Sequence, residues 1–120
     1  MIGVIEEDKA EKARDNFGIT KTEGGRAYNC DLGTISASHT DIKPYIQNTL
    51  FFGEVMKHDM VIMTLDLTGI QGTLSYKTGY FDHEDEMLDH GIAFNRIDVN
   101  KKYRMAISLW NLVEDIQIIP

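Results

Sequence analysis

Several features that define whole classes of protein are scarce in this sequence. It has a single cysteine, Cys30, so no disulfide can form within the chain. No apolar run approaches the ~20 residues that a membrane-spanning helix needs, and residues 1–9 lack the basic start and long apolar stretch of a secretory signal. We therefore expect a soluble protein in a reducing cytoplasmic compartment, with Cys30 as a small buried thiol and not a nucleophile.

Basic residues are also in the minority. Lys and Arg number 12 against 19 Asp and Glu, which gives a formal net charge of -7. Nucleic-acid affinity comes largely from cations that neutralise phosphates, so this balance argues against a nucleic-acid partner. The same argument disfavours an anionic membrane surface.

Catalytic motifs are missing as well. The sequence contains no Gly-Lys-Ser/Thr phosphate loop, no dinucleotide fingerprint, no Gly-x-Ser-x-Gly elbow and no His-Glu-x-x-His pair. All four histidines, His39, His58, His83 and His90, fall in predicted loops, where a solvated imidazole is the ordinary outcome. We therefore predict no enzymatic activity, no catalytic residue and no cofactor.

An acidic segment, residues 80–90, invites a metal interpretation. Its candidate ligands are Asp82, His83, Glu84, Asp85, Glu86, Asp89 and His90. Calcium loops of the EF type need oxygens at alternate positions around a central Gly, and structural zinc sites use paired Cys or His at defined spacings. Because neither spacing occurs here, we predict a solvated charged loop without a metal.

What the sequence does contain is alternating hydrophobicity. The length of 120 residues, of which 42% are hydrophobic, is that of one globular domain. From residue 59 to 67, Val61, Met63, Leu65 and Leu67 alternate with Ile62, Thr64 and Asp66, the period of a β-strand. Gly69 and Gly72 then mark a turn, so this strand and residues 73–77 predict a hairpin.

Further short strands are predicted along the whole chain. They cover residues 2–5, 17–20, 27–30, 92–94, 103–109 and 115–119. Residues 6–15 predict a loop with one helical turn, residues 36–48 a surface connection, and residues 50–52 a return to the core. Many short strands separated by turn signals indicate an antiparallel sandwich or barrel.

Six short runs, taken in order, resemble the SPRY family. They are Phe17-Gly18-Ile19, Ala27-Tyr28-Asn29, Phe52-Gly53-Glu54, Thr64-Leu65-Asp66-Leu67, Gly72-Thr73-Leu74-Ser75-Tyr76 and Gly91-Ile92-Ala93-Phe94. A Tyr-containing strand that ends near Ser completes the family pattern, and residues 102–108 match it. The resemblance covers residues 16–119, and its inward positions are Leu65, Leu67, Leu74, Tyr76, Ile92, Phe94 and Ile107.

The resemblance implies an all-β fold, an antiparallel bent β-sandwich of the concanavalin-like jelly-roll type, as a single domain over residues 1–120. Two departures from the family stand out. Residues 1–5 resemble a mid-domain strand, so the first strands of the family are absent, and residues 80–90 extend a hairpin loop as an insertion. An uncovered edge strand exposes unpaired N–H and C=O groups, which invites pairing with another chain or a second copy.

The resemblance also implies a protein-binding module of the kind found in adaptor, ubiquitin-ligase and signalling proteins. Relatives bind peptides through loops at one end of the sandwich, and the matching positions are Arg26, Tyr28, Asn29, Leu109, Trp110 and Asn111. Aromatic side chains recur as interface anchors because they supply large contact area at low entropic cost. The alternative is that Tyr28 and Trp110 merely cap the core. If they are anchors, their truncation to Ala abolishes partner binding without unfolding the domain.

Two other functions stay open. In the first, the chain is a structural or oligomerising fragment that associates through its uncovered sheet edge. In the second, it is a carbohydrate-binding or small-ligand-binding sandwich, which only Trp110 and Tyr28 support as stacking residues. Recognition of a protein or peptide is ranked first, on the family resemblance, although fold alone does not set function.

Overall fold

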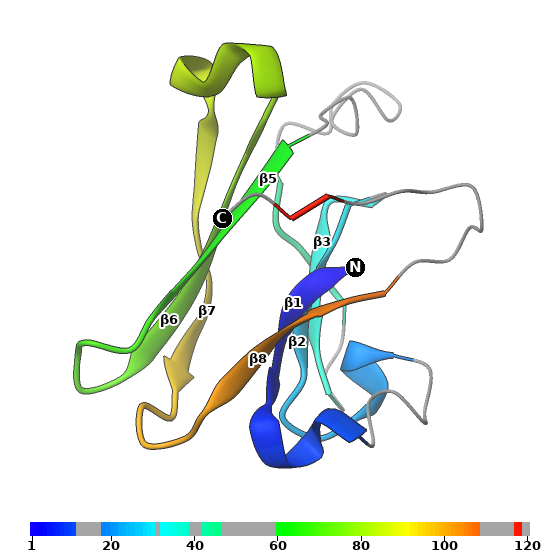
Figure 1. Cartoon of the computed structure of the whole chain (residues 1–120), viewed down its shortest axis with the longest axis vertical. Helices are drawn as coiled ribbons and strands as arrows, with labels where there is room; N and C mark the ends of the chain where they lie inside the picture. Colours follow the sequence, from blue (N-terminus) through cyan, green and yellow to red (C-terminus); the bar gives the residue numbers. More distant parts are fainter. Residues whose placement is uncertain (12–17, 31, 39–41, 47–59, 109–116, 119–120) are drawn as a thin grey trace.

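The computed structural model describes residues 1–11, 18–30, 32–38, 42–46, 60–108 and 117–118. Within them, two antiparallel sheets pack against each other, which confirms the all-β sandwich (Figure 1). One sheet has the strand order β4-β3-β2-β1-β8 and the other the order β5-β6-β7. Among the described residues, no helix has the length and apolar character needed to cross a bilayer.

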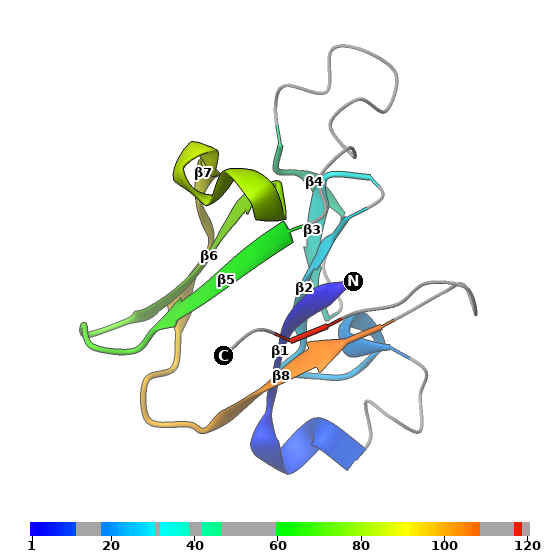
Figure 2. The same ribbon diagram turned by 45° about the horizontal axis from the view of Figure 1, so that its top comes forward.

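The strands are short, and consecutive strands are neighbours in each sheet except where β1 pairs with β8. Their bounds are β1 Ile2–Glu6, β2 Arg26–Asn29, β3 Thr34–Ala37, β4 Lys43–Pro44, β5 Met60–Asp66, β6 Gly72–Gly79, β7 Leu88–Ile97 and β8 Tyr103–Ile107. Three short 3-10 helices join them, η1 Glu7–Lys9, η2 Ile19–Lys21 and η4 Phe81–Glu86. Figure 2 shows the two sheets as separate layers, with β5 on the side of its sheet that is nearer to β8.

The core lies between the facing sides of the two sheets. Its buried members are Val4, Tyr28, Ile35, Ile46, Leu74, Tyr76 and Ile97. Leu65, Leu67 and Phe94 pack against this cluster, so the inward positions predicted for Leu65, Leu67, Leu74, Tyr76 and Phe94 are confirmed. Alternation puts every second side chain of β5 and β6 on the inner face. Fully burying an apolar side chain, as at Leu74, contributes about 1.5–3 kcal/mol.

Three tyrosines tie the two sheets together. The ring centroids of Tyr28 and Tyr76 are 5.2 Å apart, and the Tyr45 ring lies 6.0 Å from each. The Tyr76 hydroxyl donates to the carbonyl of Ile2 on β1 at 2.8 Å. The Tyr45 hydroxyl donates to the carbonyl of Gly91 on β7 and accepts the Tyr76 N–H. Polar tips of buried aromatics thus find partners across the sandwich.

This tyrosine cluster predicts loss of stability at alkaline pH. Burial raises the pKa values of Tyr28, Tyr45 and Tyr76 above the ordinary 10.0. Their contribution is therefore complete below pH 10.0 and is lost as the pH rises toward the folded-state pKa values, because only the unfolded chain releases these protons. For Tyr76 we expect a decline of about 1.4 kcal/mol per pH unit.

Urea unfolding at a series of alkaline pH values, followed by circular dichroism, measures this decline. The matched variant is Tyr76→Phe, which removes the titrating group and the bond to Ile2 and keeps the ring. It should be less stable than the wild type near neutral pH and should lose stability less steeply above pH 10.0. Parallel slopes for the two proteins would contradict the assignment.

Several predicted elements match the structure and others do not. The strands predicted at residues 2–5 and 27–30, the hairpin 59–77, and the strands at 92–94 and 103–109 correspond to β1, β2, β5, β6, β7 and β8. Within residues 6–15, predicted as a loop with one helical turn, the 3-10 helix Glu7–Lys9 is followed by helical residues Ala10 and Glu11, and residues 12–15 lie outside the described residues. Residues 50–52 lie outside the described residues, and of the strand predicted at 115–119 only residues 117–118 are described, without strand structure.

The strand predicted at residues 17–20 is wrong where it is described. Ile19 instead begins η2, and Ile19 is only 2% exposed. The segment turns back at once, because the N–H of Gly25 donates to the carbonyl of Thr22 at 3.1 Å. A Cβ at Gly25 would overlap the carbonyl oxygen of Ile19, so the close approach of Gly25 to η2 requires glycine there.

The surface connection predicted at residues 36–48 is also wrong in part, since β3 and β4 begin at Thr34 and Lys43. Their sequences carry one buried apolar residue, Ile35, which is too few to show a period. They become strands because β3 pairs along all four residues of β2, from Arg26 opposite Ala37 to Asn29 opposite Thr34.

Ile92 was predicted to point inward, and the structure corrects this. Its side chain is 60% exposed. On β6 the consecutive residues Leu74 and Ser75 pair with Phe94 and Ile92, so β7 carries one extra residue there. Such a bulge moves Ile92 to the outer face of the sheet, because adding a residue inverts the alternation.

Candidate functional site

The strand register brings two of the predicted site segments toward one end of the five-stranded sheet. Ile2 of β1 lies opposite Tyr28 of β2 on one side and opposite Ile107 of β8 on the other. Asn29 and Ser108 therefore sit at the same end of the sheet, about 10 Å apart across β1. We call this region, formed by Met1, Asn29, Leu32 and Ser108, the Asn29 end.

Backbone hydrogen bonds hold the β8 side of the Asn29 end in place. The Met1 amino nitrogen donates to the carbonyl of Ser108 at 2.8 Å, and the N–H of Ser108 donates back to the carbonyl of Met1 at 2.9 Å. Leu109, Trp110 and Asn111 follow Ser108 in the chain and lie outside the described residues.

A tight turn forms the β2 side of the Asn29 end. The Asn29 carboxamide oxygen accepts the N–H of Leu32 at 3.2 Å, and its backbone carbonyl accepts the N–H of Gly33 at 2.9 Å. Gly33 has a φ of 65°, the left-handed conformation that a glycine adopts without strain. The turn presents Leu32 to solvent, with 62% of the residue exposed.

Tyr28, predicted as an anchor for a partner, lies in the core instead. It is 0% exposed and packs between Tyr45 and Tyr76. This is the alternative weighed for it from the sequence, and its ring has no surface to offer in this structure. The reason is positional: Tyr28 lies on the inner face of β2, the strand at the centre of the five-stranded sheet.

Arg26 lies at the opposite end of β2 from Asn29. The two residues are three positions apart along the strand, which is about 10 Å, so the structure does not bring Arg26 into the Asn29 end. Its Nη1 atom is buried and makes no hydrogen bond to any described residue. Leu32, by contrast, was missed from the sequence, and its signal is one apolar residue between the turn formers Asn29 and Gly33.

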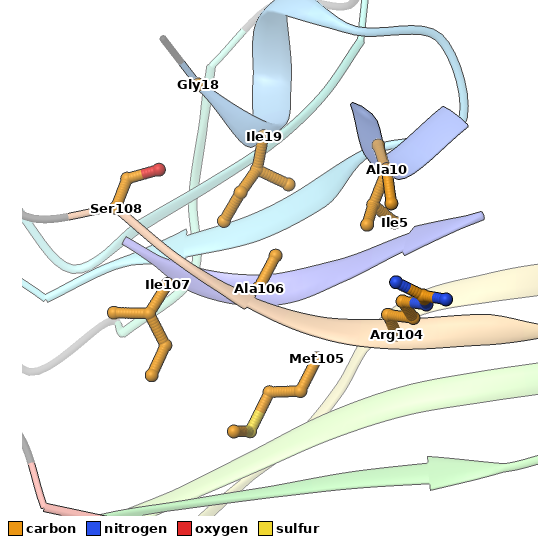
Figure 3. A pocket seen from close by; sticks show the side chains of 9 residues that line it. All are labelled: Ile5, Ala10, Gly18, Ile19, Arg104, Met105, Ala106, Ile107 and Ser108. Atoms are coloured by element: carbon orange, nitrogen blue, oxygen red, sulfur yellow. The ribbon is translucent and has the colours of Figure 1, made fainter. Parts of the chain in front are cut away.

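A shallow groove runs over the outer face of the five-stranded sheet. Its volume is about 250 Å³, and its apolar floor comes from Ile5, Ile19 and Ala106 (Figure 3). Arg104 stands at one end, where it donates to the Glu7 carboxylate at 3.2 Å. The groove is smaller than the usual 300–1,000 Å³ of ligand pockets, and its cation already has a partner.

A charged cluster occupies the neighbouring corner. Lys101 lies 3.1 Å from the carboxylate of Glu6, whose side chain is 10% exposed, and this contact raises the pKa of Lys101. Glu7, Asp8, Lys101 and Lys102 line a cavity of about 330 Å³ beside it. Two acidic and two basic residues line this cavity, so their formal charges cancel and favour neither an anion nor a cation.

His90 also differs from its prediction. It lies within β7 and not in a loop, is half-buried, and its Nε2 is 2.6 Å from the Thr78 hydroxyl oxygen. The ring also contacts Tyr45, with centroids 6.0 Å apart. The imidazole thus serves the packing of β6 against β7. His39 and His58 lie outside the described residues, and His83 is exposed in η4.

The acidic segment forms η4 and the start of β7. Asp82, Asp85 and Glu86 are exposed there. Within the part of the chain that the structure describes, no group of three or more acidic, His or Cys side chains converges on a common point.

Comparisons with models of protein families, with curated proteins and with solved structures give no match for this chain.

Proposed function

We propose that this chain is a non-catalytic, SPRY-like recognition module that binds a peptide or protein surface at the Asn29 end. The observation that supports this proposal is the register of β1 with β2 and β8, which brings Asn29 and Ser108 to one end of the sheet. These residues belong to or directly precede the two segments that the family resemblance implies as the binding site.

Exposed apolar surface at the same end favours the proposal further. Leu32 is 62% exposed on a hydrogen-bonded turn, and an anchor on a rigid turn loses little entropy on binding. Trp110 follows Ser108 by two residues, and tryptophan is among the commonest hot-spot residues of protein interfaces. The site then differs from the predicted one, because Leu32 takes the place of Tyr28.

A selection from a random peptide library tests the proposal without a known partner. Peptides enriched on the immobilised wild-type chain are measured one by one by fluorescence polarisation. Leu32→Ser and Trp110→Ala are each expected to weaken binding about 30-fold, the loss of one hot spot of about 2 kcal/mol.

The control is Ile70→Ser, which makes a similar chemical change at another exposed apolar residue. Ile70 is 97% exposed at the tip of the β5–β6 hairpin, away from the N-terminus in Figure 1. It should leave the affinity unchanged. A library that yields no binder, or binders that respond only to Ile70→Ser, would argue against recognition at the Asn29 end.

A further inference from the structure

Four described strands have only one neighbour, and three of them carry features that discourage pairing with another chain. β4 is two residues long and contains Pro44, which cannot donate a hydrogen bond. β8 has five residues and carries Arg104. β7 is irregular: its register to β6 shifts, and Gly91 and Arg96 have φ values of 78° and 59°. Charge, proline and bulges are the usual protections of sheet edges.

β5 has none of these protections. Its seven residues, Met60–Asp66, pair with β6 without interruption, from Met60 opposite Gly79 to Asp66 opposite Thr73. Its only charged residue is Asp66, at the very end. No described strand lies on its other side. A regular edge of this length, with no charge before its last residue, is a template for an additional strand.

The faces of β5 also suit an added strand. Val61, Met63 and Leu65 point to the inner face, where they are only partly buried against the core. Ile62 on the outer face is 37% exposed. A strand with apolar residues at alternate positions would cover the inner row and extend the core of the sandwich.

We propose that β5 pairs antiparallel with β5 of a second copy of this chain, so that two three-stranded sheets join into one of six strands. The two-fold axis passes between the two Met63 residues, which gives an isologous interface. This proposal concerns the three-stranded sheet and stands apart from recognition at the Asn29 end.

The register follows from the residues of β5 themselves. Only pairings that set inner residues opposite inner residues keep both cores on one side of the joined sheet, because cross-strand neighbours point to the same face. Among those, the pairing centred on Met63 uses all seven residues. It sets Val61 opposite Leu65 and Ile62 opposite Thr64 of the second copy, and Asp66 opposite Met60.

This register places no like charges directly opposite each other, because the only charged residue of the strand, Asp66, faces Met60 of the second copy. The overall formal charge of -7 on each chain still opposes approach. We therefore expect a weak dimer that becomes tighter as salt screens the repulsion, on the order of 10 µM or weaker for an interface of this small size.

Light scattering coupled to size exclusion, from about 1 µM to about 500 µM protein, measures the association. The expected mass rises with concentration from 13.6 kDa toward twice that value. Two double variants test the register. Ile62→Glu with Thr64→Lys sets opposite charges against each other across the interface, whereas Ile62→Glu with Thr64→Glu sets like charges there. Both share Ile62→Glu, which faces Lys77 of the same chain.

The variant with Ile62→Glu and Thr64→Lys should retain or strengthen the dimer. The variant with Ile62→Glu and Thr64→Glu should stay monomeric at every protein concentration, so the two dissociation constants should differ at least tenfold. Circular dichroism confirms that both variants are folded. A wild type that stays at 13.6 kDa, or a dimer that the two variants affect equally, would overturn the proposal.

A cross-link provides a second measurement that does not depend on these variants. In a Cys30→Ser background, Met63→Cys should form an intermolecular disulfide, since opposed residues of antiparallel strands lie about 4.5–5.5 Å apart. The matched Leu65→Cys should not, because the two copies of residue 65 would lie roughly 13 Å apart along the strands. Equal cross-linking at both positions, or none at position 63, would also overturn the register.

Discussion

Replacing Tyr28 by Ala is expected to lower the free energy of unfolding by about 3–5 kcal/mol, the usual cost of truncating a buried aromatic residue. Tyr28 is 0% exposed, and its ring packs against Tyr45 and Tyr76 at the junction of the two sheets. A domain of this size has a total free energy of unfolding of only about 5–15 kcal/mol. The variant should therefore lose a large part of its stability. Urea unfolding followed by circular dichroism measures the change.

Two variants separate packing from the other effects of this substitution. Tyr28→Phe keeps the ring and should cost less than about 1.5 kcal/mol. Tyr80→Ala makes the same truncation at a tyrosine that is 49% exposed and should change stability by about 0.5 kcal/mol. If Tyr28→Ala were as stable as the wild type and lost only peptide binding, Tyr28 would be an anchor as the family resemblance implies.

Gly3→Ala is expected to destabilise the chain by about 3 kcal/mol or more, the upper end of what forced overpacking costs. Gly3 lies in the middle of β1, between Ala27 of β2 and Ala106 of β8. A Cβ there would overlap the carbonyl oxygen of Arg26 and come within 2.7 Å of the Ala27 Cα. Both are backbone atoms, so only a displacement of β2 could relieve the clash.

Gly18→Ala is the matched control for this substitution. The nearest atom to its added Cβ is the Lys21 Cγ at 3.9 Å, an ordinary contact. It should leave stability unchanged or raise it by about 0.4–1 kcal/mol, because alanine reduces the entropy of the unfolded chain. Urea unfolding midpoints and the amide hydrogen exchange of β1 measure the stability of both variants. Equal stability of Gly3→Ala and the wild type would mean that β1 and β2 are not packed this closely.

The strands with a clear period could be predicted from their own residues. In β5 and β6 the alternation runs through Val61, Met63, Leu65, Leu74 and Tyr76, and all of them lie on the inner face or in the core. Local order is enough there because the hairpin pairs residues close in the chain, without register shifts.

Elements whose structure depends on distant residues could not be predicted in this way. Residues 34–37 have one buried apolar side chain, that of Ile35, and become β3 through pairing with β2. Ile92 carries the period of an inward residue, yet a bulge between β6 and β7 turns it outward. His90 was predicted to lie in a loop. It is instead part of β7, where its ring is hydrogen-bonded to the Thr78 hydroxyl.

The candidate site also has a part that could be predicted from the sequence and a part that depends on the tertiary structure. The segments around residues 26–29 and 109–111 were named from resemblance, and strand register alone determines that Asn29 and Ser108 share one end of a sheet. Sequence could not separate a buried Tyr28 from an exposed one, since an aromatic residue fits either environment. Leu32 escaped notice because one apolar residue in a turn has no period.

By itself, the sequence determined that this is an all-β protein without recognisable catalytic motifs, because alternation and composition are local properties of the chain. Only the tertiary structure decided which of the described strand edges are protected, that β5 is the unprotected one among them, and that Tyr28 belongs to the core. Those outcomes depend on which strands become neighbours, and neighbours far apart in the chain are chosen by the packing of the whole molecule.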